Sequence, residues 1–151
     1  MNFLYFDVEH AIKAHDYIIL NSGGLLGINK KGQLESILDF VREDTYYPTL
    51  EDKATYLFFS INKGHCFVDG NKRASIVLTA YFFMELNGLT NIVGRFISEM
   101  ENIAVDIADN VIDRDVLLEI IKSIIYMDYF SEELKLKLLN AKINKLLDNI
   151  D

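Results

Sequence analysis

The sequence predicts an all-α protein in which residues 1–151 form a single domain around one central buried helix, at about residues 71–87. Chain breakers are scarce, with 1 Pro and 8 Gly, which favours long helices over a β fold with many turns. Half of the residues are hydrophobic, enough to fill the core of one domain of this length. The segment 71–87 is apolar nearly all round, as expected of a helix that others surround.

Two helices are expected in the first part of the chain. Asp7 is a good N-cap, and apolar side chains recur at helical spacing through 8–19, until the small residues 22–24 end this helix. A second, shorter helix follows Gly32. Its apolar face consists of Leu34, Ile37, Leu38 and Val41.

The third helix is expected to begin at a capping box. Thr49 followed by Asp52 three residues later has the spacing of this motif, and Gly64 should end the helix. The central helix then follows a short polar segment, and Gly88 is its expected C-terminal glycine.

Three more helices are expected after the central one. Ser98 and Glu101 also have the spacing of a capping box and predict a fifth helix over 98–110. A sixth should span 113–127. A final amphipathic helix, 131–151, is an addition at the C-terminus of the same domain, and the sequence does not show whether it packs on the domain or forms a dimer contact.

Charge and composition argue against several kinds of partner. The net charge of −8 and the pI near 4.8 disfavour nucleic acid, because phosphate contacts need clustered Lys and Arg. The lone Cys66 excludes an internal disulfide and fits a reducing cytosol. The N-terminus lacks the pattern of a signal peptide, and no apolar run reaches the roughly 20 residues of a membrane span. We therefore expect a cytoplasmic protein that binds neither membrane nor nucleic acid.

The most informative stretch is residues 65–73, His-Cys-Phe-Val-Asp-Gly-Asn-Lys-Arg. Gly70–Asn71 is typical of a turn, so Lys72 and Arg73 fall in the first turn of the central helix. Cations are unfavourable at that end of the helix dipole unless an anion lies there too. With Lys63 nearby and only Asp69 opposing them, these cations predict a small positive site that suits a nucleotide phosphate.

This stretch resembles the core motif of the Fic/Doc family, His-x-Phe-x-(Asp/Glu)-(Gly/Ala)-Asn-x-x-Arg, and especially the Asn-Lys-Arg form of its death-on-curing (Doc) branch. Upstream, residues 23–27 and 32–38 resemble the Gly-Gly-Leu-x-Gly and Gly-x-x-Glu-Ser-Ala-Leu segments of Doc proteins. The resemblance spans about residues 4–126. It implies the same all-α fold.

The resemblance also implies a role for each motif residue. His65 would be the general base, a task for which imidazole is suited, although an isolated histidine in a loop more often bonds to the backbone. Asp69 would bind Mg²⁺ with the nucleotide, although an aspartate here could also be an ordinary turn residue. Phe67 would only fix the loop to the core. The phosphate-binding residues would be Gly70, Asn71, Lys72 and Arg73.

The function implied is that of a Doc-like toxin of a toxin–antitoxin pair. Such a phosphotransferase would move the terminal phosphate of a nucleoside triphosphate, with ATP expected, to a Ser, Thr or Tyr hydroxyl of a target protein. Adenylylating Fic enzymes typically read Gly-Asn-Gly-Arg-x-x-Arg, whereas this chain has Lys72 and Ile76 at the second Gly and second Arg positions. AMP transfer to a protein (AMPylation) remains an alternative. Two further alternatives are that the chain is a binding module without catalytic activity, or that it hydrolyses a phosphodiester with the help of a metal ion.

A loop over residues 44–48 is a candidate for docking the target, because relatives carry a flap at about this place. Tyr46 and Tyr47 are its candidate contact residues. Self-inhibiting Fic proteins carry a helix with Ser/Thr-x-x-x-Glu-(Gly/Asn), and Ser98–Asn102 is one residue short of that pattern. Restraint is therefore expected from a separate antitoxin protein.

Three other polar side chains have less specific signals. Cys66 neighbours His65, but adjacent side chains rarely meet, so we expect it to shape the backbone and not to act as a nucleophile. His10 and His15 are five residues apart and share no helix face. We expect both at the surface or the edge of the core.

Overall fold

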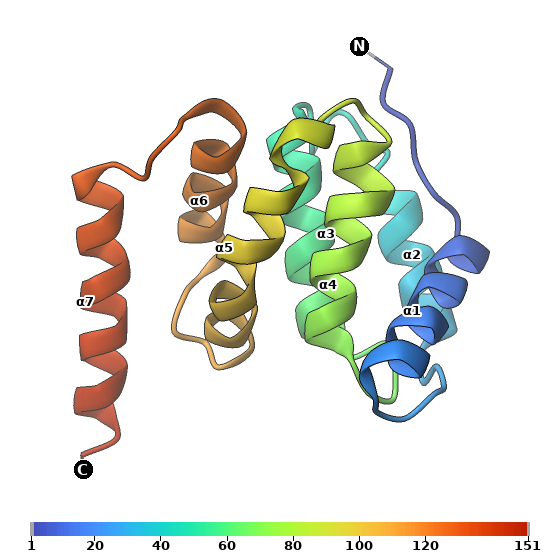
Figure 1. Cartoon of the computed structure of the whole chain (residues 1–151), viewed down its shortest axis with the longest axis horizontal. Helices are drawn as coiled ribbons and strands as arrows, with labels where there is room; N and C mark the ends of the chain where they lie inside the picture. Colours follow the sequence, from blue (N-terminus) through green and yellow to red (C-terminus); the bar gives the residue numbers. More distant parts are fainter. Residues whose placement is uncertain (1, 151) are drawn as a thin grey trace.

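The computed structural model describes residues 2–150, which contain seven α-helices, one π-helical segment (η1) and no β-strand. The all-α prediction is confirmed. Figure 1 shows the helices packed side by side with α7 at one edge. Within the described residues no helix has both the length and the apolarity to cross a membrane. The elements are α1 (Val8–Ser22), α2 (Lys31–Phe40), α3 (Leu50–Gly64), α4 (Asn71–Thr79), η1 (Ala80–Glu85), α5 (Thr90–Ala108), α6 (Arg114–Tyr126) and α7 (Glu132–Asp148).

Four helices begin at a side-chain cap. In each case the capping oxygen accepts a hydrogen bond from the backbone N–H three residues later, which satisfies a free donor of the first turn. At the start of α3 the bond is reciprocated, so the predicted capping box is confirmed. The four caps are Asp7, Thr49, Asp113 and Ser131.

The predicted start of the fifth helix was wrong. Gly88, at φ +88°, donates its N–H to the Glu85 carbonyl (3.1 Å), and Leu89 donates to the Met84 carbonyl (2.9 Å). This paired bonding is a Schellman motif, and it turns the chain so sharply that α5 begins at Thr90. Ser98 therefore lies inside α5 and caps nothing, because apolar residues at helical spacing already start at Ile92.

The central helix is not uniform. Its α-helical part, α4, continues directly into the π-helical η1. Buried positions follow one another at intervals of four, as in Ser75, Thr79 and Phe83, whereas an α-helix repeats every 3.6 residues. The wider π turn absorbs the surplus residue and keeps Phe83 and Met84 fully buried.

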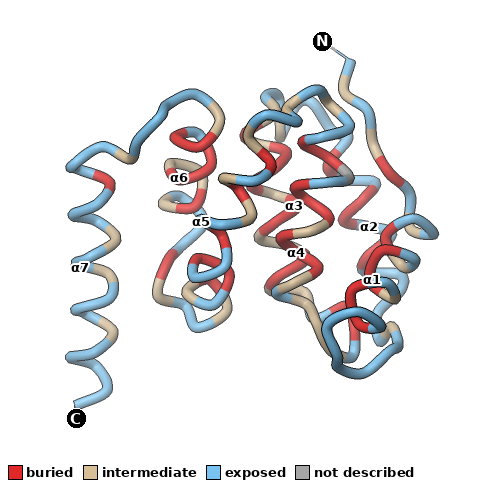
Figure 2. The backbone as a smooth tube through the Cα atoms, viewed as in Figure 1, coloured by how far each residue is buried: buried red, intermediate tan, exposed pale blue. Residues whose placement is uncertain are grey.

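The core lies around α3 and α4, which pack on each other, with α1 and α5 against α4 and with α2 and α6 against α3. Figure 2 shows the buried residues concentrated in these helices, whereas most residues of α7 are exposed. A buried lysine fixes the connection from α2 to α3. Lys53 Nζ donates to the Val41 carbonyl (2.8 Å) and pairs with Asp44 (2.8 Å). A cation with no exposed surface is tolerated because both partners reach it.

Candidate active site

The motif forms the loop between α3 and α4. His65 caps the C-terminal end of α3 in a left-handed conformation (φ 49°, ψ 44°), which a non-glycine residue keeps only when its surroundings hold it there. Gly70, also left-handed (φ 76°), precedes α4. The His65 side chain is exposed and makes no hydrogen bond to residues 2–150. Its ring is therefore open to solvent.

The glycine-rich segment after α1 is the partner of this loop. The Cys66 carbonyl accepts hydrogen bonds from the N–H groups of Asn29 (2.7 Å) and Lys30 (3.1 Å), and Val68 donates to the Gly27 carbonyl (3.0 Å). These bonds give a short antiparallel pairing of residues 27–30 with the motif loop. The two segments that carry the sequence resemblance thus lie side by side.

His15, expected at the surface or the edge of the core, is instead buried beneath the motif with 1% of its surface exposed. Its ring stacks on Phe67, with centroids 3.9 Å apart and planes inclined by 4°. Its Nε2 lies 2.6 Å from the Asp69 carbonyl oxygen. A carbonyl only accepts, so His15 must carry its proton on Nε2. The prediction failed because nothing local to α1 reveals a partner 54 residues away. His10, in contrast, is exposed as expected.

Asn71 holds the loop closed. Its Oδ1 accepts from the Phe67 N–H (3.0 Å), and its Nδ2 donates to the Phe67 carbonyl (3.0 Å). The amide expected to contact phosphate is thus engaged with the backbone, with one N–H of Nδ2 left over. Phe67 itself is buried, as expected, with 1% exposed.

Asp69 is held as an ionised carboxylate. Its Oδ2 accepts from the Leu25 N–H (3.0 Å) and its Oδ1 from the Gly70 N–H (2.8 Å). The bond from Leu25 is the main reason that the pKa of Asp69 lies below its ordinary value. Gly24 makes the close approach possible, because a Cβ at this position would lie 2.6 Å from Asp69 Oδ2.

We expected Lys63, Lys72 and Arg73 to point toward one phosphate site, but in the structure their side chains diverge. Arg73 Nη1 reaches back to α1, where it donates to Ser22 Oγ (2.5 Å) and the Gly23 carbonyl (2.7 Å). Lys63 turns away and donates to the Ile107 carbonyl at the C-terminal end of α5 (3.1 Å). Lys72 is exposed, and no described residue pairs with its side chain. Of the three, Lys72 is the one whose charge is available to a ligand.

The first turn of α4 can bind an anion. Gly70 offers no capping side chain, and the backbone N–H groups of Asn71, Lys72 and Arg73 have no acceptor in the described chain. Free donors at the positive end of a helix dipole attract phosphate. The exposed imidazole of His65 lies in the loop that leads into this turn.

Comparison with known proteins agrees with this geometry. The profile of the Fic/DOC family matches residues 5–83, just over half of the chain, and covers α1, the glycine-rich segment, the motif and most of the central helix. The chain belongs to the Fic/DOC family. A curated relative, Toxin Doc of Mycolicibacterium smegmatis (strain ATCC 700084 / mc(2)155), is 29% identical over 115 residues, which are 74% of this chain and 85% of that protein. The family prediction is confirmed.

In this Fic/DOC site Asp69 is the residue that fits Mg²⁺. Among the described residues no three or more His, Cys, Asp or Glu side chains gather around one point. Mg²⁺ does not need such a cluster, because it takes one or two carboxylates and completes its shell with water and substrate phosphates. Each Asp69 oxygen accepts one backbone bond and keeps a lone pair for a metal.

Two predicted residues of the Fic/DOC site lie away from the motif. Tyr46 and Tyr47 precede α3, whereas His65 caps its other end, so 15 residues of helix, roughly 22 Å, separate them. Tyr47 stacks on Tyr56, with centroids 4.3 Å apart.

Cys66 is fully buried, and burial raises the pKa of its thiol, which is the opposite of what a nucleophile needs.

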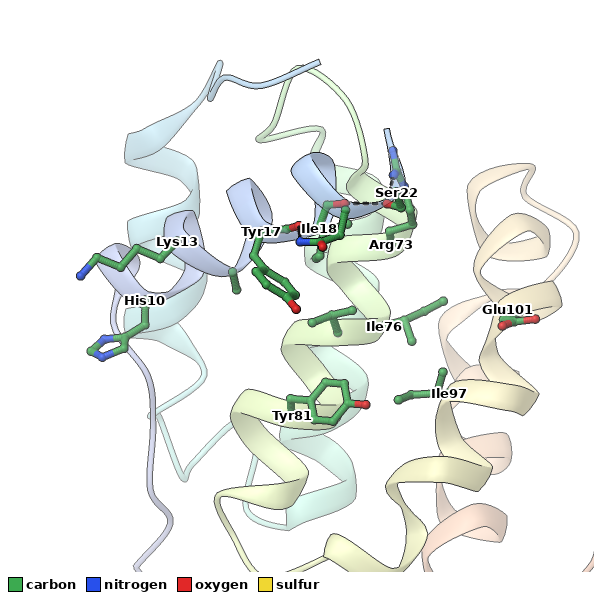
Figure 3. Close-up of a pocket in the computed structure, with 13 residues that line it drawn as sticks. His10, Lys13, Tyr17, Ile18, Ser22, Arg73, Ile76, Tyr81, Ile97 and Glu101 are labelled. Carbon is green, nitrogen blue, oxygen red and sulfur yellow. Dashed lines mark hydrogen bonds between the residues drawn. The ribbon is translucent and has the colours of Figure 1, made fainter. Parts of the chain in front are cut away.

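A groove missed by sequence reasoning borders the Fic/DOC motif. It lies between α1, α4 and α5, has a volume of about 680 Å³, and has Arg73 in its wall. Figure 3 shows Tyr17, Ile76 and Ile97 facing it, with Arg73 bonded to Ser22 nearby. Its lining is mostly apolar. The apolar spacing of α1 and α4 was visible in the sequence, but which side chains remain uncovered depends on how the helices pack.

Proposed function

We propose that this protein is a Doc-like toxin that transfers the terminal phosphate of a nucleoside triphosphate, ATP in the simplest case, to a hydroxyl side chain of a target protein. The observation that carries the proposal is the exposed, unpaired imidazole of His65 in the loop that leads into the free N-terminus of α4. A base and an anion site close together are what phosphoryl transfer requires.

Each residue has a distinct task in this proposal. His65 accepts the proton of the target hydroxyl as its oxygen attacks the γ phosphorus, while the bond to the β–γ bridging oxygen breaks and the nucleoside diphosphate leaves. The N–H groups of the first turn of α4, with the charge of Lys72, stabilise the negative charge on the phosphoryl group that moves. Asp69 would hold Mg²⁺, and the ion would supply positive charge to the nucleotide phosphates. His15 and Asn71 are positioning residues, because they keep the loop in shape from beneath.

The residue at position 76 favours phosphate over AMP transfer. Ile76 lies one turn after Arg73 and is nearly buried, with 9% exposed. An adenylylating relative would carry a second guanidinium here to clamp the distal phosphates. An apolar side chain cannot do this, whereas Lys72 adds a charge at the start of α4, which suits transfer of the terminal group.

We place the target next to residues 25–28. Leu25 and Leu26 are exposed (65% and 52%), and the N–H groups of Leu26 and Ile28 have no acceptor among the described residues. An extended target segment could pair with this backbone edge and bring its hydroxyl to His65. Tyr46 and Tyr47 would then contact only a part of the target remote from that hydroxyl.

We further propose that the apolar groove binds the antitoxin. A partner of this kind is implied by the relative named Toxin Doc. The lining of the groove suits the apolar face of an amphipathic helix. Such a helix would cover Arg73 and bring the partner close to the phosphate site.

The test uses ATP labelled at either the α or the γ phosphate, incubated with the protein, Mg²⁺ and an extract of a sensitive host. Label should move to protein from the γ position only, and His65→Ala should abolish transfer while the protein stays folded. Lys72→Ala should cut the rate by roughly a hundredfold or more, since one donor aimed at developing charge contributes about 2.7–4 kcal/mol. Lys122→Ala, an exposed lysine of α6, is the matched control.

Other outcomes identify the alternatives. Transfer of α label with release of pyrophosphate would make the protein an adenylylating enzyme despite Lys72 and Ile76. No transfer from either position, together with harmless expression of the wild type in several hosts, would favour a catalytically idle binding module. Undiminished transfer by soluble His65→Ala would remove His65 from the role of base.

A further inference from the structure

The outward side of α7 carries a line of large apolar side chains, here called the outer stripe. Between 43% and 75% of each is exposed, and no described residue covers the line. Monomeric proteins rarely leave so continuous an apolar surface in water. The stripe consists of Leu136, Leu139, Ile143, Leu146 and Leu147 on α7, continued by Ile150 just after the helix ends at Asp148.

The opposite side of α7 is already occupied. Leu134 is buried against the domain with 4% exposed, and Leu138 packs beside it. Two ion pairs fix the rotation of the helix: Lys137 contacts Glu119 of α6 (3.0 Å), and Lys142 contacts Asp106 of α5 (3.5 Å). The outer stripe therefore cannot turn inward, and the helix has two apolar faces of which the domain uses one.

The spacing of the outer stripe identifies the shape of its partner. Within α7 the steps from Leu136 to Leu146 are three, four and three residues, through Leu139 and Ile143, and Ile150 follows four residues later, just past the end of the helix. This alternation is the a/d pattern of a coiled-coil seam, which packs against another helix of the same period at a small crossing angle. The seam lies on a protruding helix at the edge of the molecule, as Figure 1 shows, so a second protruding helix can reach it. A second copy of this chain would provide such a helix, its own α7.

The charges beside the stripe permit self-association. On one flank lie the neutral Asn140 and Asn144, and on the other Lys135 and Lys142, which already pair with Glu132 and Asp106. Between residues 134 and 147 there is no carboxylate, so two copies of an acidic protein meet here without acidic side chains facing each other. An anionic membrane is a poorer occupant, because the lysines are neutralised and the whole chain carries −8.

The same charges select the antiparallel arrangement. A parallel pair would bring Glu132 and Glu133 of both copies together at one end and align the two helix dipoles. An antiparallel pair places each acidic N-terminus beside the other C-terminus, and it matches the a positions of one helix with the d positions of the other. Leu136 then meets Leu146 of the partner subunit, and Leu139 meets Ile143 of the partner subunit.

We propose that this protein forms a two-fold symmetric homodimer through antiparallel pairing of the outer stripes of α7. The interface is isologous, so it closes at two copies and does not grow into a fibre. It lies on the far side of the domain from the motif and does not depend on the proposed transfer reaction.

Light scattering coupled to gel filtration, over a dilution series of the full chain, tests the dimer. The wild type should have twice the mass of the chain, and Ile143→Glu should halve it while far-UV circular dichroism stays unchanged. Asn144→Glu adds the same charge to the neighbouring position off the stripe and should remain dimeric. A monomeric wild type, or loss of the dimer in both variants, would overturn the proposal, and binding of the monomer to phosphatidylserine vesicles would show that a membrane covers the stripe instead.

Disulfide formation tests the orientation. Cys66 is fully buried, so an introduced surface cysteine is the thiol that reacts. In the antiparallel dimer position 140 lies near its own copy across the two-fold axis, and Asn140→Cys should link into a covalent dimer under mild oxidation. Asn144→Cys, which points away, should not. Linking by Leu139→Cys but not Asn140→Cys would refute the antiparallel pairing.

Discussion

Replacing His15 by Phe isolates one hydrogen bond in the support of the active-site loop. Phenylalanine keeps a flat ring that can stack on Phe67 at the observed 3.9 Å, but it cannot donate to the Asp69 carbonyl. A carbonyl left without its partner in a partly buried position costs about 1–3 kcal/mol. For a chain of this size that corresponds to a fall in Tm of about 2–12 °C.

His15→Ala should cost more, because it removes the ring as well as the donor. Truncating a buried aromatic side chain typically costs about 3–5 kcal/mol, since neighbours such as Phe67 only partly fill the cavity. Urea unfolding gives the free energies directly. His10→Phe is the control: this histidine is exposed on the same helix, and because the pair with Asp7 that its replacement removes is exposed too, stability should fall by no more than about 1 kcal/mol.

The same variants report on function. If His15 positions the motif loop, His15→Phe should lower kcat for phosphate transfer at temperatures where the protein remains folded, while KM for ATP changes little. Equal stability and equal kcat in His15→Phe and wild type would refute the inference that this bond fixes the loop. A loss of stability with unchanged kcat would make His15 a core residue and nothing more.

Three further predictions concern the same loop. Gly24→Ala should lower stability by about 1–3 kcal/mol and reduce transfer, because φ is +118° there and the new Cβ would meet Asp69; Gly32→Ala, with open space around it, should do neither. The pKa of Asp69 is lowered in the folded protein, chiefly by Leu25, so its stabilising effect is present above the ordinary value of 3.8 and is lost as pH falls through and below it. Asp69→Asn should therefore flatten the acid side of a stability–pH profile measured down to about pH 3 by urea unfolding. Cys66→Ala should leave transfer largely intact, and the native thiol should resist iodoacetamide at neutral pH, because burial raises its pKa.

Each of these has an opposing result. An active and stable Gly24→Ala would mean that Asp69 tolerates displacement. An unchanged acid profile in Asp69→Asn would show that other carboxylates, such as Asp7 and Asp44, whose pKa values are also lowered, account for the slope. Complete loss of transfer in Cys66→Ala with unchanged melting and ATP binding would restore a catalytic thiol.

Much of the fold was predictable because its signals are local. A cap such as Asp7 or Ser131 and its donor are three residues apart, and a terminal glycine such as Gly88 acts on its own turn. The error at the fifth helix has the same origin: Ser98 has the spacing of a capping box, but an earlier tight turn had already started the helix.

The site was predictable in position but not in detail. The motif and the glycine-rich segment were visible as patterns of residue type. The hydrogen-bond partners of the side chains were not predictable, because Arg73 bonds to Ser22 of α1 and Lys63 to Ile107 of α5, across 51 and 44 residues. The burial of Lys53 has no local signal either, because its partners come from the preceding loop.

The π-helical segment η1 has a consequence for how this chain can change in length. A π turn holds one residue more than the α register needs, so a deletion there can be absorbed by reversion to an ordinary helix. Removing Tyr81 should leave Phe83 and Met84 facing the core and the motif end of α4 undisturbed. Removing Ile76 instead would rotate residues 77–79, which precede η1, by about 100° and carry the buried Leu78 and Thr79 out of the core. Melting temperatures of the two deletion variants should differ accordingly, which makes η1 the place where the central helix can lose a residue and still fold.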